Sequence, residues 1–544
     1  MATGSGNGKT YFLFVFFSLV SIYCLSISSA RTSMNYGEGF MRVSALENFV
    51  RTGHLYVNSG NWGILGRGGR RYIWHEFGQD IFVLPFYLFT RRTAYGFFLV
   101  NAIATALTCI LIIKILLGRG FSLKGATLAS FSYGLGTIAW HYGSKTPHEH
   151  APAILFTVSA LYFAIKYTES FRPRHLVLSA LSIGFGFITK MDVLVSLLPL
   201  GLFFYLKRDA LRKGGVRLPK AAAIFFALLI PFACVMLYYN YYRFGNIFQT
   251  GYGSIFADQA SKGAGFSLKY VPMGLAGILA SPGKSIFLFS PVLLLFPLSI
   301  KKFRRKAGRD FFLVLCAYIL VYTLFYCSYF GWSGDWCYGP RFFMLPALFM
   351  TMATAALFDS WQAIARSKQM LVITIISASI CLQIASVGAN AWLGNCLHFG
   401  ISDDNWPNAP LRNFGEVGTW KYTSSYFVPQ YSQLYNQLRL FSISVNTMLD
   451  RDFPERLVAG LALEQPAPKS EDYLLLVVLL NYYPLYATLD VWWLQHPGAP
   501  AYGTALIIGL AGVVSILAIM RKWRKPDEGQ YAATVTGAVE GNDK

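Results

Sequence analysis

Charged residues are scarce in this chain: Asp, Glu, Lys and Arg together make up 13% of its 544 residues. Soluble domains average about 25%, so the low value excludes a chain that is solvated mainly by water. Cysteine is also rare, with 8 residues. Most of them lie in apolar runs, where cysteine behaves as a small apolar side chain, so the sequence predicts no disulfide framework.

The sequence also lacks an obvious internal repeat, a low-complexity tract and a soluble catalytic domain. Hydrophobic residues instead make up 54% of it, in successive runs that are long enough to cross a hydrocarbon core of about 30 Å. We therefore expect an all-α polytopic membrane protein. About twelve transmembrane spans are predicted, at 11–30, 96–117, 124–140, 151–168, 176–190, 191–206, 221–238, 284–300, 310–327, 342–358, 369–390 and 503–520.

Two further apolar stretches are not counted as spans. Residues 80–89 are too short to cross the bilayer, so a surface or re-entrant position is expected for them. Residues 473–493 are long enough, but a crossing there would place the basic residues after Met520 outside the cytoplasm. That stretch is therefore predicted not to span.

The net charge of +21 is carried largely by Lys and Arg in the short loops between spans. Such loops stay in the cytoplasm, and these clusters recur on one side of the predicted spans. The charge therefore indicates a multi-pass protein of a bacterial inner or plasma membrane, with both termini cytoplasmic and the bilayer, not a nucleic acid, as its partner. The clusters lie at 207–220, 301–306, 366–368 and 521–525.

This topology divides the chain into four predicted parts. Residues 1–390 form a transmembrane core whose first outer loop covers 31–95. An extracytoplasmic cap follows at 391–472. The chain ends in terminal membrane segments at 473–520 and a flexible cytoplasmic tail at 521–544.

The polar residues that could take part in catalysis or binding lie in the predicted outer loops. Glu38 follows the first span closely, and acids held near a membrane are costly and hence functional candidates. A second carboxylate, Glu149, stands between His148 and His150 in the second outer loop. The remaining candidates are cations, aromatic rings and polar groups of the same side, namely His75, Asp80, Arg243, Tyr252, Lys284 and Arg341.

A sugar transferase needs this mixture of groups. A carboxylate takes the proton from the acceptor hydroxyl as that hydroxyl attacks the anomeric carbon. Arginine stabilises the departing phosphate with its planar fork. The logic parallels that of an inverting glycosidase, in which a carboxylate activates the incoming nucleophile.

At these residues the chain resembles the polytopic C-superfamily (GT-C) glycosyltransferases, especially the branch with the protein O-mannosyltransferases and the aminoarabinose transferase of lipid A. That family has an acid just after the first span, then a helix ending in a Ser/Thr-Gly step. Counted back from Thr52-Gly53, the family's Asp falls on Glu38. Glu149 matches an acid at the head of the fourth span. Further similar blocks follow in order at 78–87, 189–190, 240–252, 281–284 and 332–341.

The resemblance implies a hexosyl- or pentosyltransferase with a polyprenyl-phosphate sugar donor and an extracytoplasmic glycan, lipid or protein acceptor. Glu38 would be the catalytic base, and Arg341 with Lys284 would bind the phosphate leaving group. The other substrate-binding candidates would be Glu149, Arg243, Tyr252, His75 and Asp80. A divalent cation is the candidate cofactor, with His148, Glu149 and His150 as its ligands.

The chain departs from the family pattern beside the proposed base. The second acid that often follows it falls on Gly39, and the family's nearby Arg falls on Met41, with Arg42 one place off. Simpler roles also stay open, since an acid in the first turn of a helix favours the positive end of its dipole, and Arg at a span end commonly reaches lipid headgroups. Two alternative functions remain: a transporter or flippase of lipid-linked sugars, and a non-catalytic scaffold of the same fold.

Overall fold

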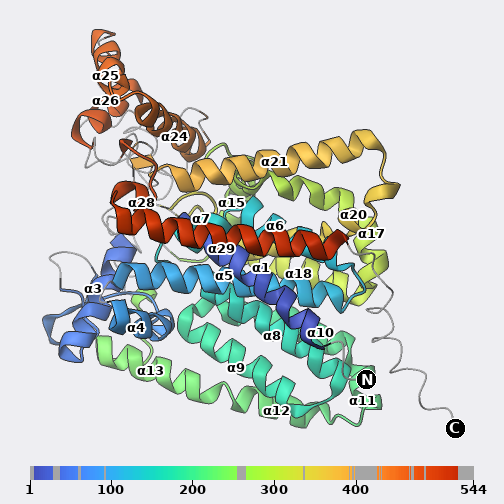
Figure 1. The fold of residues 1–544 in the computed structure, drawn as a ribbon. Helices are drawn as coiled ribbons and strands as arrows, with labels where there is room; N and C mark the ends of the chain where they lie inside the picture. Colours follow the sequence, from blue (N-terminus) through green and yellow to red (C-terminus); the bar gives the residue numbers. More distant parts are fainter. Residues whose placement is uncertain are drawn as a thin grey trace.

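The computed structural model describes residues 5–28, 37–58, 63–90, 93–253, 265–334, 337–390, 393–394, 397, 426–427, 429, 432–464, 466, 471–482 and 486–524. Long helices dominate this part of the chain and run side by side as one bundle (Figure 1). The strands within it are two short ones, β1 (Ile64–Leu65) and β2 (Arg71–Tyr72), which pair antiparallel. The expected all-α polytopic membrane fold is therefore confirmed.

Eight stretches of the described chain are long and apolar enough to cross a membrane. They coincide with α1 (Ser5–Leu25), α5 (Thr93–Leu117), α8 (His150–Ser170), α12–α13 (Leu218–Ala227 and Ile230–Phe244), α18 (Arg309–Cys327), η6–α20 (Arg341–Asp359), α21 (Arg366–Gly388) and α29 (Ala499–Arg524). The four other predicted spans fall on shorter helices: α6 (Leu123–Gly136), α9 (Pro173–Thr189), η2–α10 (Met191–Leu206) and α16–α17 (Ile286–Ala307).

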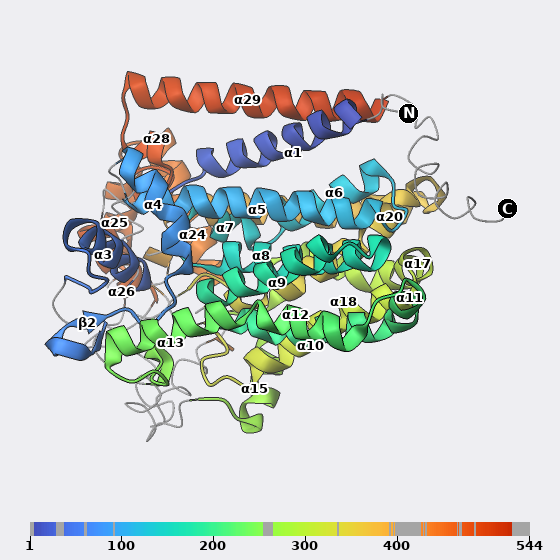
Figure 2. The same cartoon turned by 90° about the horizontal axis from the view of Figure 1, so that it is seen from below.

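The two ends of the bundle differ in what they carry. The basic helices α11 (Arg208–Lys213) and α17 (Phe296–Ala307) lie at the end where α1 begins and α29 ends (Figure 2). The opposite end carries α3 (Gly37–Thr52), α4 (Gly78–Thr90) and α24 (Gln433–Leu449). The basic loops and the two terminal helix ends thus share one side, as the charge pattern predicts. That this side is cytoplasmic stays a prediction.

A small second core lies at the end of the bundle with α3 (Figure 1). It packs α24 against α25 (Phe453–Leu463) and α26 (Glu471–Asn481), with Leu440, Leu461 and Val478 buried among them. Within residues 473–493, the described helices are α26, of 11 residues, and the four-residue α28 (Trp492–Gln495). Neither has the roughly 20 residues that a transmembrane helix needs.

The segment before α29 is tied to the outer end of α1. The indole Nε1 atoms of Trp492 and Trp493 donate to the carbonyl oxygens of Cys24 and Leu25 at 2.8 and 2.9 Å. Asp490 accepts a hydrogen bond from Ser28 Oγ at 2.7 Å and pairs with Lys145 of the second outer loop at 3.4 Å. The C-terminal segment therefore joins the starts of the first two outer loops.

Candidate functional site

A buried ion pair joins the first and second outer loops. Arg42 on α3 donates from Nη2 to Oε2 of Glu149 at 2.6 Å, and the two side chains are 0% and 3% exposed. Burial raises the pKa of Glu149, but Arg42 and then His75 outweigh it, so the pKa lies well below its usual value. Glu149 is the N-cap residue of α8, yet its side chain makes no capping hydrogen bond. The carboxylate is therefore used for contacts between loops.

His75 and Tyr252, both predicted substrate-binding residues, lie beside this pair. His75 Nδ1 is 2.8 Å from the Tyr252 hydroxyl and 3.8 Å from Glu149 Oε1. Arg243 is fully buried behind them and donates from Nη1 to the backbone carbonyl oxygens of Ile73 and His75. Arg243 thus holds the loop that carries His75; that it also binds substrate stays a prediction.

Two further carboxyl groups are buried around Glu149. Burial, with Glu149 contributing, raises the pKa of Glu76 from 4.5 to about 7. Burial also raises the pKa of Asp80 from 3.8 to about 7, although Arg42 opposes the shift. Among the described residues, Glu76 Oε2 and Asp80 Oδ1 have no hydrogen-bond partner. Asp80 is one of the predicted site residues, whereas Glu76 is not.

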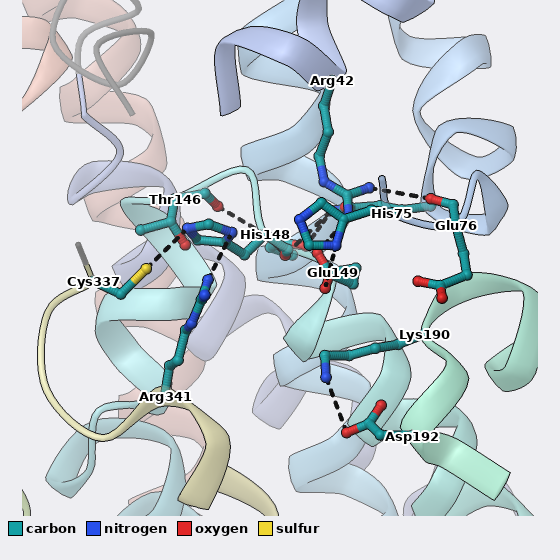
Figure 3. A network of polar contacts seen from close by, with 12 residues as sticks. Arg42, His75, Glu76, Thr146, His148, Glu149, Lys190, Asp192, Cys337 and Arg341 are labelled. Atoms are coloured by element: carbon teal, nitrogen blue, oxygen red, sulfur yellow. Dashed lines mark hydrogen bonds and ion pairs between the residues drawn. The ribbon is translucent and has the colours of Figure 1, made fainter. Parts of the chain in front are cut away.

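A small cavity of about 20 Å³ lies beside the start of α8, and two cations line it: Lys190 and Arg341. Lys190 Nζ lies 3.0 Å from Asp192 Oδ2 and donates to the Tyr326 hydroxyl at 2.7 Å. The Tyr326 ring stacks on Phe342 with centroids 4.4 Å apart. The cavity lining thus combines positive charge, polar groups and aromatic rings, and Figure 3 shows Lys190, Asp192 and Arg341 among these residues.

Arg341 reaches this cavity from η6 and also contacts the second outer loop. Its Nη1 atom lies 3.5 Å from His148 Nδ1, and Cys337 Sγ lies 3.6 Å from the other ring nitrogen of His148 (Figure 3). His150 lines the cavity beside Arg341. Within the described ranges, no group of three or more His, Cys, Asp or Glu residues is arranged to hold a metal ion. The predicted ligand set of His148, Glu149 and His150 therefore finds no support there.

Two other predicted residues need separate comment. Lys284 is fully buried and donates to the carbonyl oxygens of Cys337 and Gly339 at 2.7 and 3.1 Å. It holds the loop that leads to Arg341 and does not line the cavity. The side chain of Glu38 is outside the described part of the chain. Its backbone lies in the first turn of α3, four residues before Arg42.

Sequence reasoning thus found Glu149, His75, Tyr252, Asp80 and Arg341, which the structure brings to one region. It did not predict the ion pair of Arg42 with Glu149, and it did not include Glu76, Lys190 and Asp192 among the site residues. One signal was available: Asp192 is an acid at the start of an apolar run, and intramembrane acids are functional candidates by default.

Comparisons with known proteins agree with the predicted resemblance. Residues 81–238 match the family model described as dolichyl-phosphate-mannose-protein mannosyltransferase. This segment contains Glu149, Lys190 and Asp192, but neither Glu38 nor Arg341. The resemblance to polytopic GT-C glycosyltransferases is therefore confirmed over this segment. None of the curated proteins matches the chain.

Solved structures with a similar arrangement of helices also exist. ArnT from Cupriavidus metallidurans, bound to undecaprenyl phosphate, is 13% identical, with a TM-score of 0.45; the alignment covers 84% of this chain and 81% of ArnT. Archaeal oligosaccharyltransferase AglB from Archaeoglobus fulgidus is 11% identical, also with a TM-score of 0.45. That alignment covers 75% of this chain and 59% of AglB.

Proposed function

We propose that this protein is a membrane glycosyltransferase that moves a sugar, with inversion, from a polyprenyl-phosphate carrier to an extracytoplasmic acceptor. The observation that carries the proposal is the cavity lined by Lys190 and Arg341 next to the buried carboxylates of the outer loops. Two cations in a water-poor site suit a phosphate leaving group, since fixed charges there stabilise developing negative charge. The family-model match supports the same class of reaction.

In the proposed reaction, an acceptor hydroxyl attacks the anomeric carbon while the bond from that carbon to the phosphate oxygen breaks. The bonding electrons leave with the phosphate, which Lys190 and Arg341 bind. The carboxylate of Glu38 takes the hydroxyl proton. We assign this role to Glu38 and not to Glu149, because the ion pair with Arg42 holds the pKa of Glu149 well below its usual value and makes it a weak base.

The structure favours an enzyme over the alternative of a transporter. Transporters commonly place their sites near the middle of the bilayer, at discontinuous helices related by repeats. Here the carboxylates contact residues of α3 and of the segment before α4, at the end of the bundle that carries these helices (Figure 2), and the cations line a cavity beside the start of α8. A scaffold without activity would keep the same geometry, so only a transfer assay separates it from an enzyme.

The test measures transfer of mannose from polyprenyl-phosphate mannose, the donor type that the family model suggests. It uses the purified full-length chain and membranes that contain it. Glu38→Gln is expected to lower release of polyprenyl phosphate at least about 100-fold, within the range attributed to a general base. Glu38→Asp restores the family's usual residue and should keep substantial activity. Full activity in Glu38→Gln would remove Glu38 as the base, and carrier binding without turnover in the unmodified protein would favour the scaffold.

A further inference from the structure

An unusual group of arginines lies on the side of the bundle where basic residues are normally scarce. Arg67, Arg70 and Arg71 fall within five residues of the first outer loop, which the charge pattern places outside the cytoplasm. They belong to a hairpin made of β1, the short helix η1 (Arg67–Gly69) and β2. We call residues 63–72 the arginine hairpin. The positive-inside rule associates Lys and Arg with cytoplasmic loops. The membrane topology therefore does not explain why these three arginines lie in this outer loop.

The arginine hairpin rests on the outer end of a lipid-facing helix. Tyr72 packs edge-on against Tyr242 and Phe244 at the end of α13. The guanidinium of Arg67 lies 5.2 Å from the ring centroid of Tyr241, which is 43% exposed. Only 11% of the apolar window of α12–α13 is buried within the protein. The hairpin therefore lies at the level where this helix leaves the hydrocarbon, beside the bundle (Figure 2).

Exposed apolar side chains occur in the hairpin itself, in α13 and just after α13. Leu65 is 63% exposed, Tyr238 is 68% exposed and Phe248 is 78% exposed. Aromatic residues at the end of a span are typical of the membrane–water interface, where the ring contacts lipid and the polar tip contacts headgroups. The surroundings of the hairpin thus face lipid.

Within the described ranges, no ion pair neutralises the charges of the hairpin. Among the described residues, no acidic side chain forms an ion pair with Arg67, Arg70 or Arg71. Arg71 donates to the carbonyl oxygen of Gly63 at 2.9 Å, and the guanidinium of Arg70 lies 4.5 Å from the ring centroid of Tyr56. Arg67 and Arg70 are exposed, so most of their N–H groups are available to an anion.

We infer that the arginine hairpin binds the headgroups of anionic phospholipids in the outer leaflet. Guanidinium groups bind phosphate oxygens in a planar, two-pronged geometry. A basic residue near an anionic membrane surface contributes about 1 kcal/mol, which is about fivefold in affinity. The contact would fix the depth of α13 and the hairpin in the membrane. This inference does not depend on the proposed transfer reaction.

The test uses the purified full-length protein in vesicles of phosphatidylcholine that contain a minority of photoactivatable phosphatidylglycerol, with the reactive group at the headgroup. Irradiation and mass spectrometry of peptides are expected to map crosslinks to residues 63–72 and 238–248. Arg67→Gln and Arg70→Gln should each lower this labelling about fivefold, the change that corresponds to one basic residue at an anionic surface. High salt should lower it further.

A control removes three positive charges elsewhere on that side, more than either hairpin variant removes. The variant Arg51→Gln/Lys269→Gln/Arg451→Gln changes three exposed residues and should leave labelling of the hairpin unchanged. Equal labelling by photoactivatable phosphatidylcholine would overturn the inference, and so would equal loss in the control variant. Labelling of the hairpin by a photoactivatable polyprenyl phosphate, but not by phosphatidylglycerol, would assign it to the carrier instead. Unchanged thermal unfolding of each single variant verifies that it is folded.

Discussion

At the scale of single residues, the site contains buried charges that would be destabilising without partners. Burying an ion costs several kcal/mol unless a partner and further hydrogen bonds compensate for it. Arg42 provides that partner for Glu149 across 107 residues of sequence. Lys190 does the same for Asp192, with Tyr326 as a second donor. The carboxyl groups without such a cation, Glu76 and Asp80, respond by raising their pKa values to about 7.

Glu76 gives a testable pH dependence. The pKa of Glu76 is about 7 in the folded protein and 4.5 in an ordinary environment. Between pH 4.5 and pH 7, Glu76 therefore binds more protons in the folded state than in the unfolded state. Its contribution to stability is therefore present below about pH 4.5 and lost as the pH rises through about 7. Compared with Glu76→Gln, the unmodified protein should lose up to about 3 kcal/mol over this window, at about 1.4 kcal/mol per pKa unit.

The measurement is thermal unfolding in detergent from pH 4.5 to pH 8. The groups that face Glu76 and affect its titration are Glu149, Lys190 and Arg243, so the variant must keep all three. Glu455→Gln, which removes an exposed carboxylate on α25, serves as the control. Stability curves of Glu76→Gln and the unmodified protein that run parallel across this window would show that Glu76 titrates in its ordinary range.

At the scale of elements, hydropathy predicted the helices well, because a chain in lipid must satisfy its backbone hydrogen bonds within each segment. The span predicted at 310–327, for example, lies within α18, and the span predicted at 369–390 overlaps α21 up to its end at Gly388. The side-chain contacts were less predictable. The position of Lys284 in a polar loop led to the prediction that it binds phosphate. In the fold, its ammonium group donates to backbone carbonyl oxygens instead. Lys190 and Tyr326 meet although 136 residues separate them, and no local pattern marks such a contact.

The buried pair of Lys145 and Asp490 gives a prediction at this scale. Removing one partner of a buried ion pair leaves an uncompensated charge and costs about 3–5 kcal/mol. Lys145→Met should therefore lower stability by about this amount, and Lys145→Met/Asp490→Leu should recover much of it. The exposed pair of Lys166 and Glu169 is the control, where Lys166→Met should change stability by less than about 1 kcal/mol.

Thermal unfolding of the three variants and the unmodified protein in one detergent checks this contrast. The transfer assay on the same samples then shows whether the contact between the C-terminal segment and the outer loops positions the site. A double variant that regains stability but not activity would support positioning. Equal losses at the buried and the exposed pair would contradict the buried role of Lys145 and Asp490.

At the scale of the whole molecule, the bundle has two chemically different ends, with α11 and α17 at one and α3 and α24 at the other. We expect Lys213→Cys at the first end and Arg451→Cys at the second to react with a membrane-impermeant maleimide from opposite sides. In intact cells, only Arg451→Cys should be labelled, and in inside-out vesicles only Lys213→Cys. The parent protein, with its own cysteines, measures the background. Labelling of both positions from one side would contradict the predicted topology.

The anchoring of residues 490–493 to the outer end of α1 has a consequence for biosynthesis. The ribosome makes α1 first and α29 last, yet these two helices pack together in the finished protein. Asp490, which joins the first two outer loops through Ser28 and Lys145, emerges after nearly all the other helices have been inserted. A nascent chain therefore lacks this support until residues 490–493 have been made, and the contacts of Asp490 with Ser28 and Lys145 can form only after the segments that they join are in place.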